Sequence, residues 1–250
     1  DFAFAVIMLQ KSIGANNTQF RTPNGLDAEG HYTTAAELAL IGSYAIKNQD
    51  FREIIATTTY SLKELTKGRT FNVTNKDRFL YMMDGAIGIK TGFTGKAGYC
   101  FVGAIDIDDR TFISVVLGSG WPPNKSYKWA DTQKLMKYGL DNYTKHRLLE
   151  ILHIQQPDFK VPSKIAIANG RKTEATLYMK ENIRNEELLL KDNDVVQAKV
   201  NMKAYMEAPV LKDSVVGHVE YYVNDILYRK VPVYVKEEVK KINFPFVLSF

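Results

Sequence analysis

Three short apolar runs in the middle of the chain constrain its fold more than any other feature. They cover residues 88–92, 98–105 and 111–117, and two turn-like polar segments, residues 94–96 and 106–110, separate them. Short apolar runs bounded by turn residues are typical of strands that pair with their neighbours in sequence. The pattern therefore predicts an antiparallel meander of three strands.

Helices are predicted on both sides of this meander. Thr34 with Glu37 three residues later is the pattern of a capping box, and helical spacing of apolar residues from Leu38 onward indicates a helix that ends at Asn48. Tyr127 to Leu140 returns to the same spacing, so a second helix is expected to pack on the sheet. Weaker patterns predict helices at residues 3–14 and 51–56 and a strand at residues 57–62.

Beyond residue 142 the pattern changes to short strands separated by turn residues such as Asn169-Gly170 and Asn224-Asp225. This alternation is typical of a small all-β domain. The strands are predicted at residues 164–168, 175–179, 195–200, 215–223 and 226–235. We therefore expect an α+β domain at residues 1–142, a β-sandwich-like domain at 143–240 and a separate tail at 241–250.

Composition excludes several classes of function. The 250 residues are 45% hydrophobic and carry a net charge of +5 that is spread along the chain, so no block of Lys and Arg indicates nucleic-acid binding. A single cysteine, Cys100, excludes an intrachain disulfide, and four histidines lack the paired spacing of a zinc site. We expect no metal and no cofactor.

Lys90-Thr91-Gly92 is the segment that suggests chemistry. It lies at the end of a predicted strand and is followed by a turn, so a lysine and a hydroxyl lie beside a glycine that lets another backbone approach closely. An extended peptide could pair with such an edge. On its own the tripeptide is weak evidence, and a solvated strand lysine is the simpler interpretation.

Several other segments occur in a fixed order around it and carry a family resemblance. They are Asn24-Gly25-Leu26-Asp27, His31-Tyr32-Thr33-Thr34-Ala35, Gly88-Ile89-Lys90-Thr91-Gly92-Phe93-Thr94, Ala97-Gly98-Tyr99-Cys100 and Val115-Val116-Leu117-Gly118. Together they resemble the low-molecular-mass penicillin-binding proteins, serine D-alanyl-D-alanine carboxypeptidases of peptidase family S11. The resemblance implies the C-terminal part of a penicillin-binding, β-lactamase-like transpeptidase domain, followed by that family's second, β-rich domain.

The resemblance also implies roles for individual residues. Lys90 would supply positive charge beside the nucleophile and assist proton transfer, Thr91 would hydrogen-bond the terminal carboxylate of the substrate, and Gly92 would permit close approach. The backbone N–H of Phe93 would be one oxyanion-hole donor. Lys128 would be a cation that faces the substrate carboxylate, as a point charge without the bidentate geometry of arginine.

The nucleophile of this mechanism is missing from the sequence. No Ser-x-x-Lys and no Ser-x-Asn motif occurs; Ser43 to Lys47 is one residue too long and Ser61 to Lys63 one too short. In the resembled family both motifs precede the matching segment, so the chain is expected to be an N-terminally truncated piece. We expect the 250 residues alone to be catalytically silent.

The implied activity is removal of the terminal D-alanine from peptidoglycan stem peptides through a serine acyl-enzyme. The partners would be stem peptides ending in D-Ala-D-Ala and β-lactam antibiotics. The protein would be located in the cell envelope, at the outer face of the cytoplasmic membrane. Two alternatives remain open, a β-lactamase-like serine hydrolase and a non-catalytic envelope-binding module. Residues 244–250 leave two interpretations, packing against the β domain or the beginning of an amphipathic membrane anchor.

Overall fold

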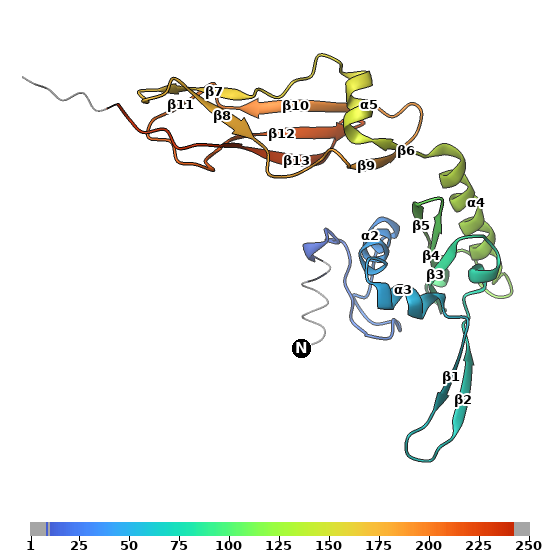
Figure 1. The fold of residues 1–250 in the computed structure, drawn as a ribbon. Coiled ribbons are helices and arrows are strands. Elements are labelled where there is room, and N and C mark those ends of the chain that lie inside the picture. The colour runs from blue at the N-terminus through green and yellow to red at the C-terminus, as the bar shows by residue number, and fades with distance from the viewer. Residues whose placement is uncertain (1–8, 10, 243–250) are drawn as a thin grey trace, which may run out of the picture. The chain divides into compact units, whose positions relative to one another are not determined.

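The computed structural model describes residue 9 and residues 11–242. The fold is α+β, and the chain divides into two compact units, residues 1–141 and 142–250, each with a core of its own (Figure 1). The helix predicted at residues 3–14 falls largely outside the described residues, and so does the predicted tail beyond residue 242.

The predicted three-stranded meander is confirmed and forms the centre of the first unit. Its strands are β3 (Ala86–Thr94), β4 (Gly98–Ile107) and β5 (Arg110–Val116), in the order β3-β4-β5 and antiparallel throughout. Asp108 and Asp109, both with positive φ, make the tight turn between β4 and β5. The sheet therefore has two outer strands, β3 and β5, one at each edge.

Helices cover both faces of this sheet. Helix α2 (Ala35–Ala45) lies against β5, and α3 (Gln49–Ala56) lies against β3. Gly42 allows the close approach of α2, because a Cβ there would lie only 3.3 Å from the Cδ1 of Ile89 on β3. On the other face α4 (Tyr127–Asn142) contributes to a buried cluster. Its members are Phe79, Phe101, Ile105, Trp129 and Met136.

The ends of the first two helices differ from the prediction. Helix α2 ends at Ala45, and Asn48 instead begins α3, where its side chain accepts a hydrogen bond from the N–H of Phe51. The expected capping box is half formed, since Thr34 accepts from the N–H of Glu37 at 3.2 Å. The carboxylate of Glu37 turns to the preceding loop, because the donors there satisfy a buried acid better than one backbone N–H does.

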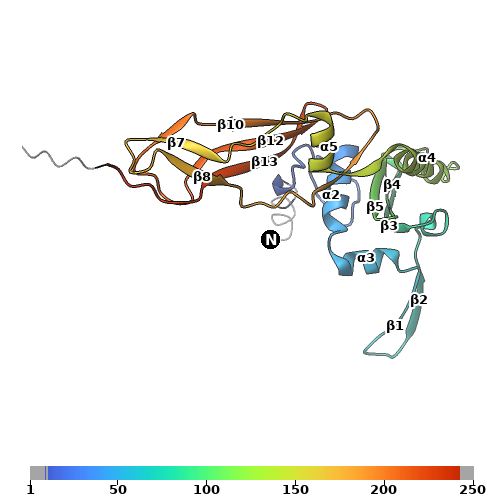
Figure 2. The ribbon, with the colours of Figure 1, turned by 45° about the horizontal axis from the view of Figure 1, so that its top comes forward.

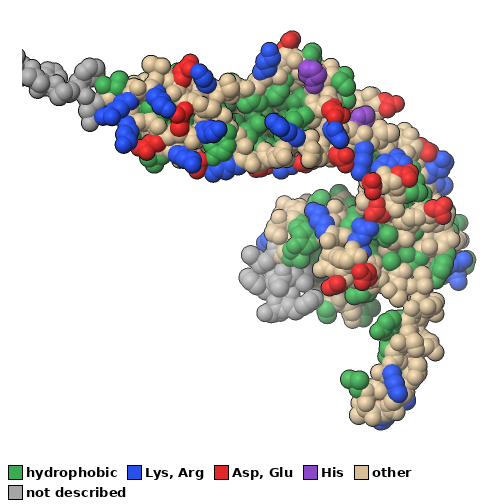
Figure 3. Space-filling model, in the orientation of Figure 1, with side chains coloured by type: hydrophobic (Ala, Val, Ile, Leu, Met, Phe, Trp, Pro, Cys, Tyr) green, Lys and Arg blue, Asp and Glu red, His purple; other side chains and the backbone are tan. Residues whose placement is uncertain are grey.

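A two-stranded hairpin extends from the first unit between α3 and the short helix η1 (Arg78–Tyr81). It pairs β1 (Thr59–Lys63) with β2 (Thr70–Thr74), and every residue of both strands is exposed. Register places apolar side chains opposite one another on one face, and Figure 3 shows hydrophobic atoms exposed on the hairpin. The prediction contained only its first strand, because β2 is polar at three of its five positions.

The second unit consists mainly of a six-stranded sheet in the order β10-β12-β13-β8-β7-β11. All of its pairs are antiparallel except β11 with β7. Its strands are β7 (Lys164–Ala168), β8 (Glu174–Tyr178), β10 (Val196–Met202), β11 (Tyr205–Glu207), β12 (Val215–Val223) and β13 (Ile226–Val235). The five predicted strands are all present, and Asn224-Asp225 makes the predicted turn between the last two.

Four elements of the second unit were not predicted, and the short edge strand β11 is one of them. Strands β6 (Thr144–Arg147) and β9 (Glu187–Leu190) form a separate two-stranded sheet, and α5 (Leu148–Gln155) packs beside β10 (Figure 2). The unit is therefore not entirely β. Leu148 and Leu152 anchor α5 in the core, which explains why this short helix is stable despite its length. None of the described helices is long and apolar enough to cross a membrane.

Candidate active site

The predicted site segment lies on an open edge of the first sheet. Lys90, Thr91, Gly92 and Phe93 all belong to β3, which pairs only with β4. The other side of β3 is not paired with any described strand. An edge strand of this kind presents backbone N–H and C=O groups to which an extended peptide can add as a further strand.

The direction of the Phe93 backbone follows from its partner in the sheet. Tyr99 lies opposite Phe93, but the N–H of Tyr99 donates to Gly120 and its carbonyl accepts from Ser119, both at 2.9 Å and both on the side away from β3. Opposite residues in an antiparallel pair either exchange both hydrogen bonds or neither. The N–H and C=O of Phe93 therefore point to the open edge, and so do those of Thr91.

Lys90 brings its charge to the same edge. Its side chain is exposed, and its Nζ donates to the carbonyl oxygen of Thr91 at 2.7 Å. Because that carbonyl faces outward, the ammonium group lies along the unpaired side of β3. An incoming backbone N–H could replace this contact, which would free the ammonium group.

Gly92 leaves space beside the strand. A Cβ placed there would meet only the Cβ of Cys100, at 3.8 Å, an ordinary van der Waals distance, and its backbone is not in the left-handed region. Nothing in the described packing requires a glycine here. The absence of a side chain therefore leaves the face around Gly92 open to a ligand.

Lys128 reaches the site from α4 and is unusually buried for a lysine. Only 8% of its surface is exposed, and its Nζ lies 4.6 Å from the ring centre of Trp129 and 5.4 Å from that of Tyr99. The Tyr99 ring in turn lies 4.5 Å from the ring of Phe93. Cation–π contacts of this kind partly replace water around the ammonium group. Lys128 is thus held on the same face of the sheet as Phe93 and Thr91.

A buried carboxylate completes the cluster. Asp77 is 3% exposed, and burial raises its pKa to about 6, against the opposing effects of a hydrogen bond from the Phe79 N–H and of the positive charges of Lys128 and Lys90. Burial lowers the pKa of Lys128, as does Lys90, while Asp77 and Cys100 raise it. These ionisable groups therefore act on one another at the β3 edge.

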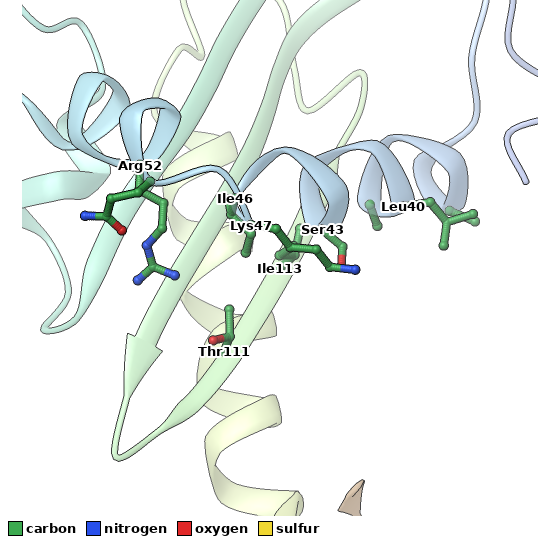
Figure 4. A pocket seen from close by; sticks show the side chains of 10 residues that line it. Leu40, Ser43, Ile46, Lys47, Arg52, Thr111 and Ile113 are labelled. Atoms are coloured by element: carbon green, nitrogen blue, oxygen red, sulfur yellow. The ribbon is translucent and has the colours of Figure 1, made fainter. Parts of the chain in front are cut away.

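A separate hollow lies away from β3. It measures about 880 Å³ and lies beside β5, the edge opposite β3. Figure 4 shows Ser43 of α2, Lys47 of the following loop and Arg52 of α3 lining this hollow together with Thr111 and Ile113 of β5. No hydrogen bond joins Ser43 to Lys47 in the described part of the chain. This agrees with the interpretation of that serine and lysine as ordinary surface residues.

Two family models match successive parts of the chain. Residues 3–120 match the family model described as D-alanyl-D-alanine carboxypeptidase, and residues 153–241 match that of the penicillin-binding protein 5 C-terminal domain. The two matches follow one another in the order that the resemblance predicted. The first unit, over residues 3–120, belongs to the D-alanyl-D-alanine carboxypeptidase family.

Individual curated carboxypeptidases are similar to the chain in sequence. The chain is 26% identical over 234 residues to D-alanyl-D-alanine carboxypeptidase DacF of Bacillus subtilis, covering 94% of this chain and 57% of that protein. It is 36% identical over 132 residues to a D-alanyl-D-alanine carboxypeptidase of Streptomyces sp. K15, covering 51% of this chain and 44% of that protein. The chain thus spans about half the length of the curated carboxypeptidases it matches.

Solved structures support the fold of the chain. Penicillin-binding protein 5 from Haemophilus influenzae superimposes with a TM-score of 0.66 at 22% identity, covering 96% of this chain and 66% of that one. The Streptomyces K15 DD-transpeptidase gives a TM-score of 0.52 at 31% identity, covering 56% of this chain and 54% of that one. At 22% identity, the similarity to penicillin-binding protein 5 shows a shared fold only.

The geometry brings together most of the residues selected from the sequence. Thr91 and Phe93 share a face with Lys128, and Lys90 reaches the open edge beside them, whereas Asp77 was missed. A signal for it existed, since an aspartate two residues before Phe79 is a typical helix cap. Its burial beside two lysines could not be read from that pattern. No group of three or more potential metal ligands occurs in the part of the chain that the structure describes.

Proposed function

We propose that these 250 residues form the substrate-binding side of a peptidoglycan D-alanyl-D-alanine carboxypeptidase. The full-length gene product would remove the terminal D-alanine of stem peptides through a serine acyl-enzyme that water then hydrolyses. The observation that carries the proposal is the open edge of β3, where the outward Phe93 N–H, Thr91 and two lysine ammonium groups lie together. The family membership of both units supports it.

Each residue has a role that follows from its position. A stem peptide would add to β3 as an extended strand, with the open space at Gly92 admitting its backbone. In the described part of the chain no hydrogen bond engages the Thr91 hydroxyl, which leaves it available to the terminal carboxylate. Lys128 would attract that carboxylate as a buried cation, and the Phe93 N–H would donate to the oxyanion of the tetrahedral intermediate. Lys90 would assist proton transfer at the nucleophile.

The nucleophilic serine is not among these residues, since no Ser-x-x-Lys occurs in the sequence. The proposal therefore requires that another segment of the gene product supply it. The same observation favours a second candidate function, a non-catalytic envelope module that binds stem peptides at β3 without acylation. A β-lactamase-like hydrolase is less well supported, because the second unit matches a penicillin-binding protein domain.

The partners follow from the same chemistry. Stem peptides ending in D-Ala-D-Ala are the substrates we propose, and β-lactams, whose carboxylate and acyl group imitate that ending, are the inhibitors. We propose that the protein acts outside the cytoplasm, in the cell envelope at the outer face of the cytoplasmic membrane. An amphipathic anchor after residue 240 is part of the proposal, although those residues lie largely outside the described structure.

Release of D-alanine from diacetyl-L-lysyl-D-alanyl-D-alanine by the full-length gene product tests the function. We expect turnover in the wild type and a loss of about 100-fold or more in kcat/KM for Lys90→Ala, because general acid–base groups contribute on that order. Lys96→Ala is the matched control, since Lys96 is an exposed lysine in the next turn. Binding without turnover would support the envelope module, and equal activity of the two variants would refute the role of Lys90.

A further inference from the structure

Asp77 lies in the segment that leads from the hairpin into η1. Its Oδ1 accepts a hydrogen bond from the N–H of Phe79 at 2.9 Å, and its own N–H donates to Asn75 Oδ1 at 2.9 Å. Its Oδ2 is buried and has no hydrogen-bond partner in the described part of the chain. The backbone contacts fix the position of the carboxyl group and leave one of its oxygens without a hydrogen bond in the described part of the chain.

Burying a carboxylate oxygen without a hydrogen bond costs free energy unless another group stabilises it. An unpaired buried carboxylate loses its hydration and either takes a proton or requires a positive charge nearby. The charges that act on Asp77 come from Lys128 on α4 and Lys90 on β3. Lys128 is in the corresponding situation, because aromatic rings surround its ammonium group and no ion pair is formed with it in the described structure.

Two buried, opposite charges thus lie near each other behind the β3 edge without a direct salt bridge. The groups that act on Lys128 are Asp77, Lys90 and Cys100, which come from three different elements. Asp77 is the only carboxylate among them. An acidic ligand that reached Lys128 would therefore bring a second negative charge into the same buried cluster.

We propose that Asp77 is a positioning residue that serves as the counterion of Lys128 when the site is empty and takes up a proton when a peptide carboxylate replaces it. This inference rests on the proposed function, because it assumes that Lys128 receives the terminal carboxylate. The proton comes from solvent and stays on Asp77 while the ligand is bound. Binding of the peptide is then coupled to uptake of up to one proton.

The direction of the pH dependence follows from linkage. The ligand's negative charge raises the pKa of Asp77 above its value in the empty site, which is about 6. Below that pH Asp77 is already neutral, and the ligand binds without opposition. Above it, binding requires proton uptake, so KM rises with pH by up to about tenfold for each pH unit until it exceeds the pKa of the complex.

The variant Asp77→Asn isolates the charge. Its side-chain oxygen can still accept from the Phe79 N–H, so the cap of η1 is retained. The matched control is Asp131→Asn, which removes a more exposed carboxylate from α4, the helix of Lys128. Tryptophan fluorescence verifies folding, because Trp121 and Trp129 both lie in the first unit.

The first measurement is an NMR titration of the Lys128 side chain in the 250-residue chain. We expect Asp77→Asn to lower the pKa of Lys128 by about 1 or more, because it removes the nearby opposite charge, and Asp131→Asn to leave it unchanged. An unchanged Lys128 pKa in Asp77→Asn would overturn the inference. This measurement needs no substrate, so it is decisive even if the proposed function is wrong.

The second measurement is the pH profile of KM for D-alanine release by the full-length gene product. We expect KM to rise above about pH 6 in the wild type and to be flat in Asp77→Asn, with kcat changed much less. A flat profile in the wild type, or a wild-type profile retained by Asp77→Asn, would refute proton uptake by Asp77. Absence of any turnover in the wild type would instead refute the proposed function.

Discussion

Two glycines near the proposed site differ sharply in what they should tolerate, and exchanging each for alanine tests the geometry of the β3 edge. Gly92 has an ordinary backbone conformation, and an added Cβ would meet only Cys100, at 3.8 Å. Gly98, at the start of β4, has φ of +70°, and its Cβ would lie 2.9 Å from the carbonyl oxygen of Gly120 and from ring atoms of Trp121. A methyl group therefore fits at position 92 and does not fit at position 98.

The expected magnitudes follow from these contacts. Gly92→Ala should raise the free energy of unfolding by about 0.4 to 1 kcal/mol, because alanine restricts the unfolded chain without strain in the folded one. Gly98→Ala should lower it by roughly 2 to 4 kcal/mol, since left-handed backbone strain and overpacking against a backbone atom add together. The sign of the effect therefore differs between two neighbouring substitutions of the same kind.

Urea unfolding followed by tryptophan fluorescence measures this difference. Both tryptophans, Trp121 and Trp129, belong to the first unit, so the signal reports on that unit and not on the second. Gly95→Ala is the control, because a Cβ there meets nothing within 4 Å. Destabilisation of Gly92→Ala by more than about 1 kcal/mol would contradict an open face at this position. A neutral Gly98→Ala would contradict the turn geometry.

Two further predictions concern the acid response of the first unit and its reactivity. Hydrogen bonds from Thr18 and Asn17 outweigh the burial of Glu37 and hold its pKa below 4.5, so its stabilising effect is present above that pH and is lost as pH falls through the lower, folded-state pKa. Glu37→Gln should therefore be less stable than the wild type at neutral pH, and the difference should shrink in acid unfolding curves below about pH 4.5. The isolated 250 residues should form no covalent adduct with a fluorescent penicillin, and a stable labelled band after denaturing electrophoresis would show that a nucleophile is present after all.

The sequence predicted the regular parts of the fold because local patterns determine them. The meander, α4 and the long strands β12 and β13 each combine a clear apolar period with turn residues at both ends. Elements that depend on distant partners were missed. Strand β9 pairs with β6 and strand β11 pairs with β7, and neither pairing can be identified from a local window.

The same distinction applies to the candidate site. Lys90 to Phe93 could be selected from the sequence because their chemistry depends on one strand and its neighbours in the chain. Asp77 could not, because its significance arises only when η1, β3 and α4 pack together and remove water from a carboxylate and an ammonium group at once.

This contrast changes how the β3 edge should be understood. A surface lysine beside an exposed strand would attract a carboxylate weakly at physiological ionic strength, because water and salt screen the interaction. Lys128 is instead held between aromatic rings, and Asp77 is the only carboxylate among the described groups that act on it. A ligand carboxylate that enters such a place meets a cation with little competition from water. The specificity of the edge for a peptide with a free C-terminus would therefore depend on the packing of η1 and α4 behind β3 as much as on the Lys90-Thr91-Gly92 segment itself.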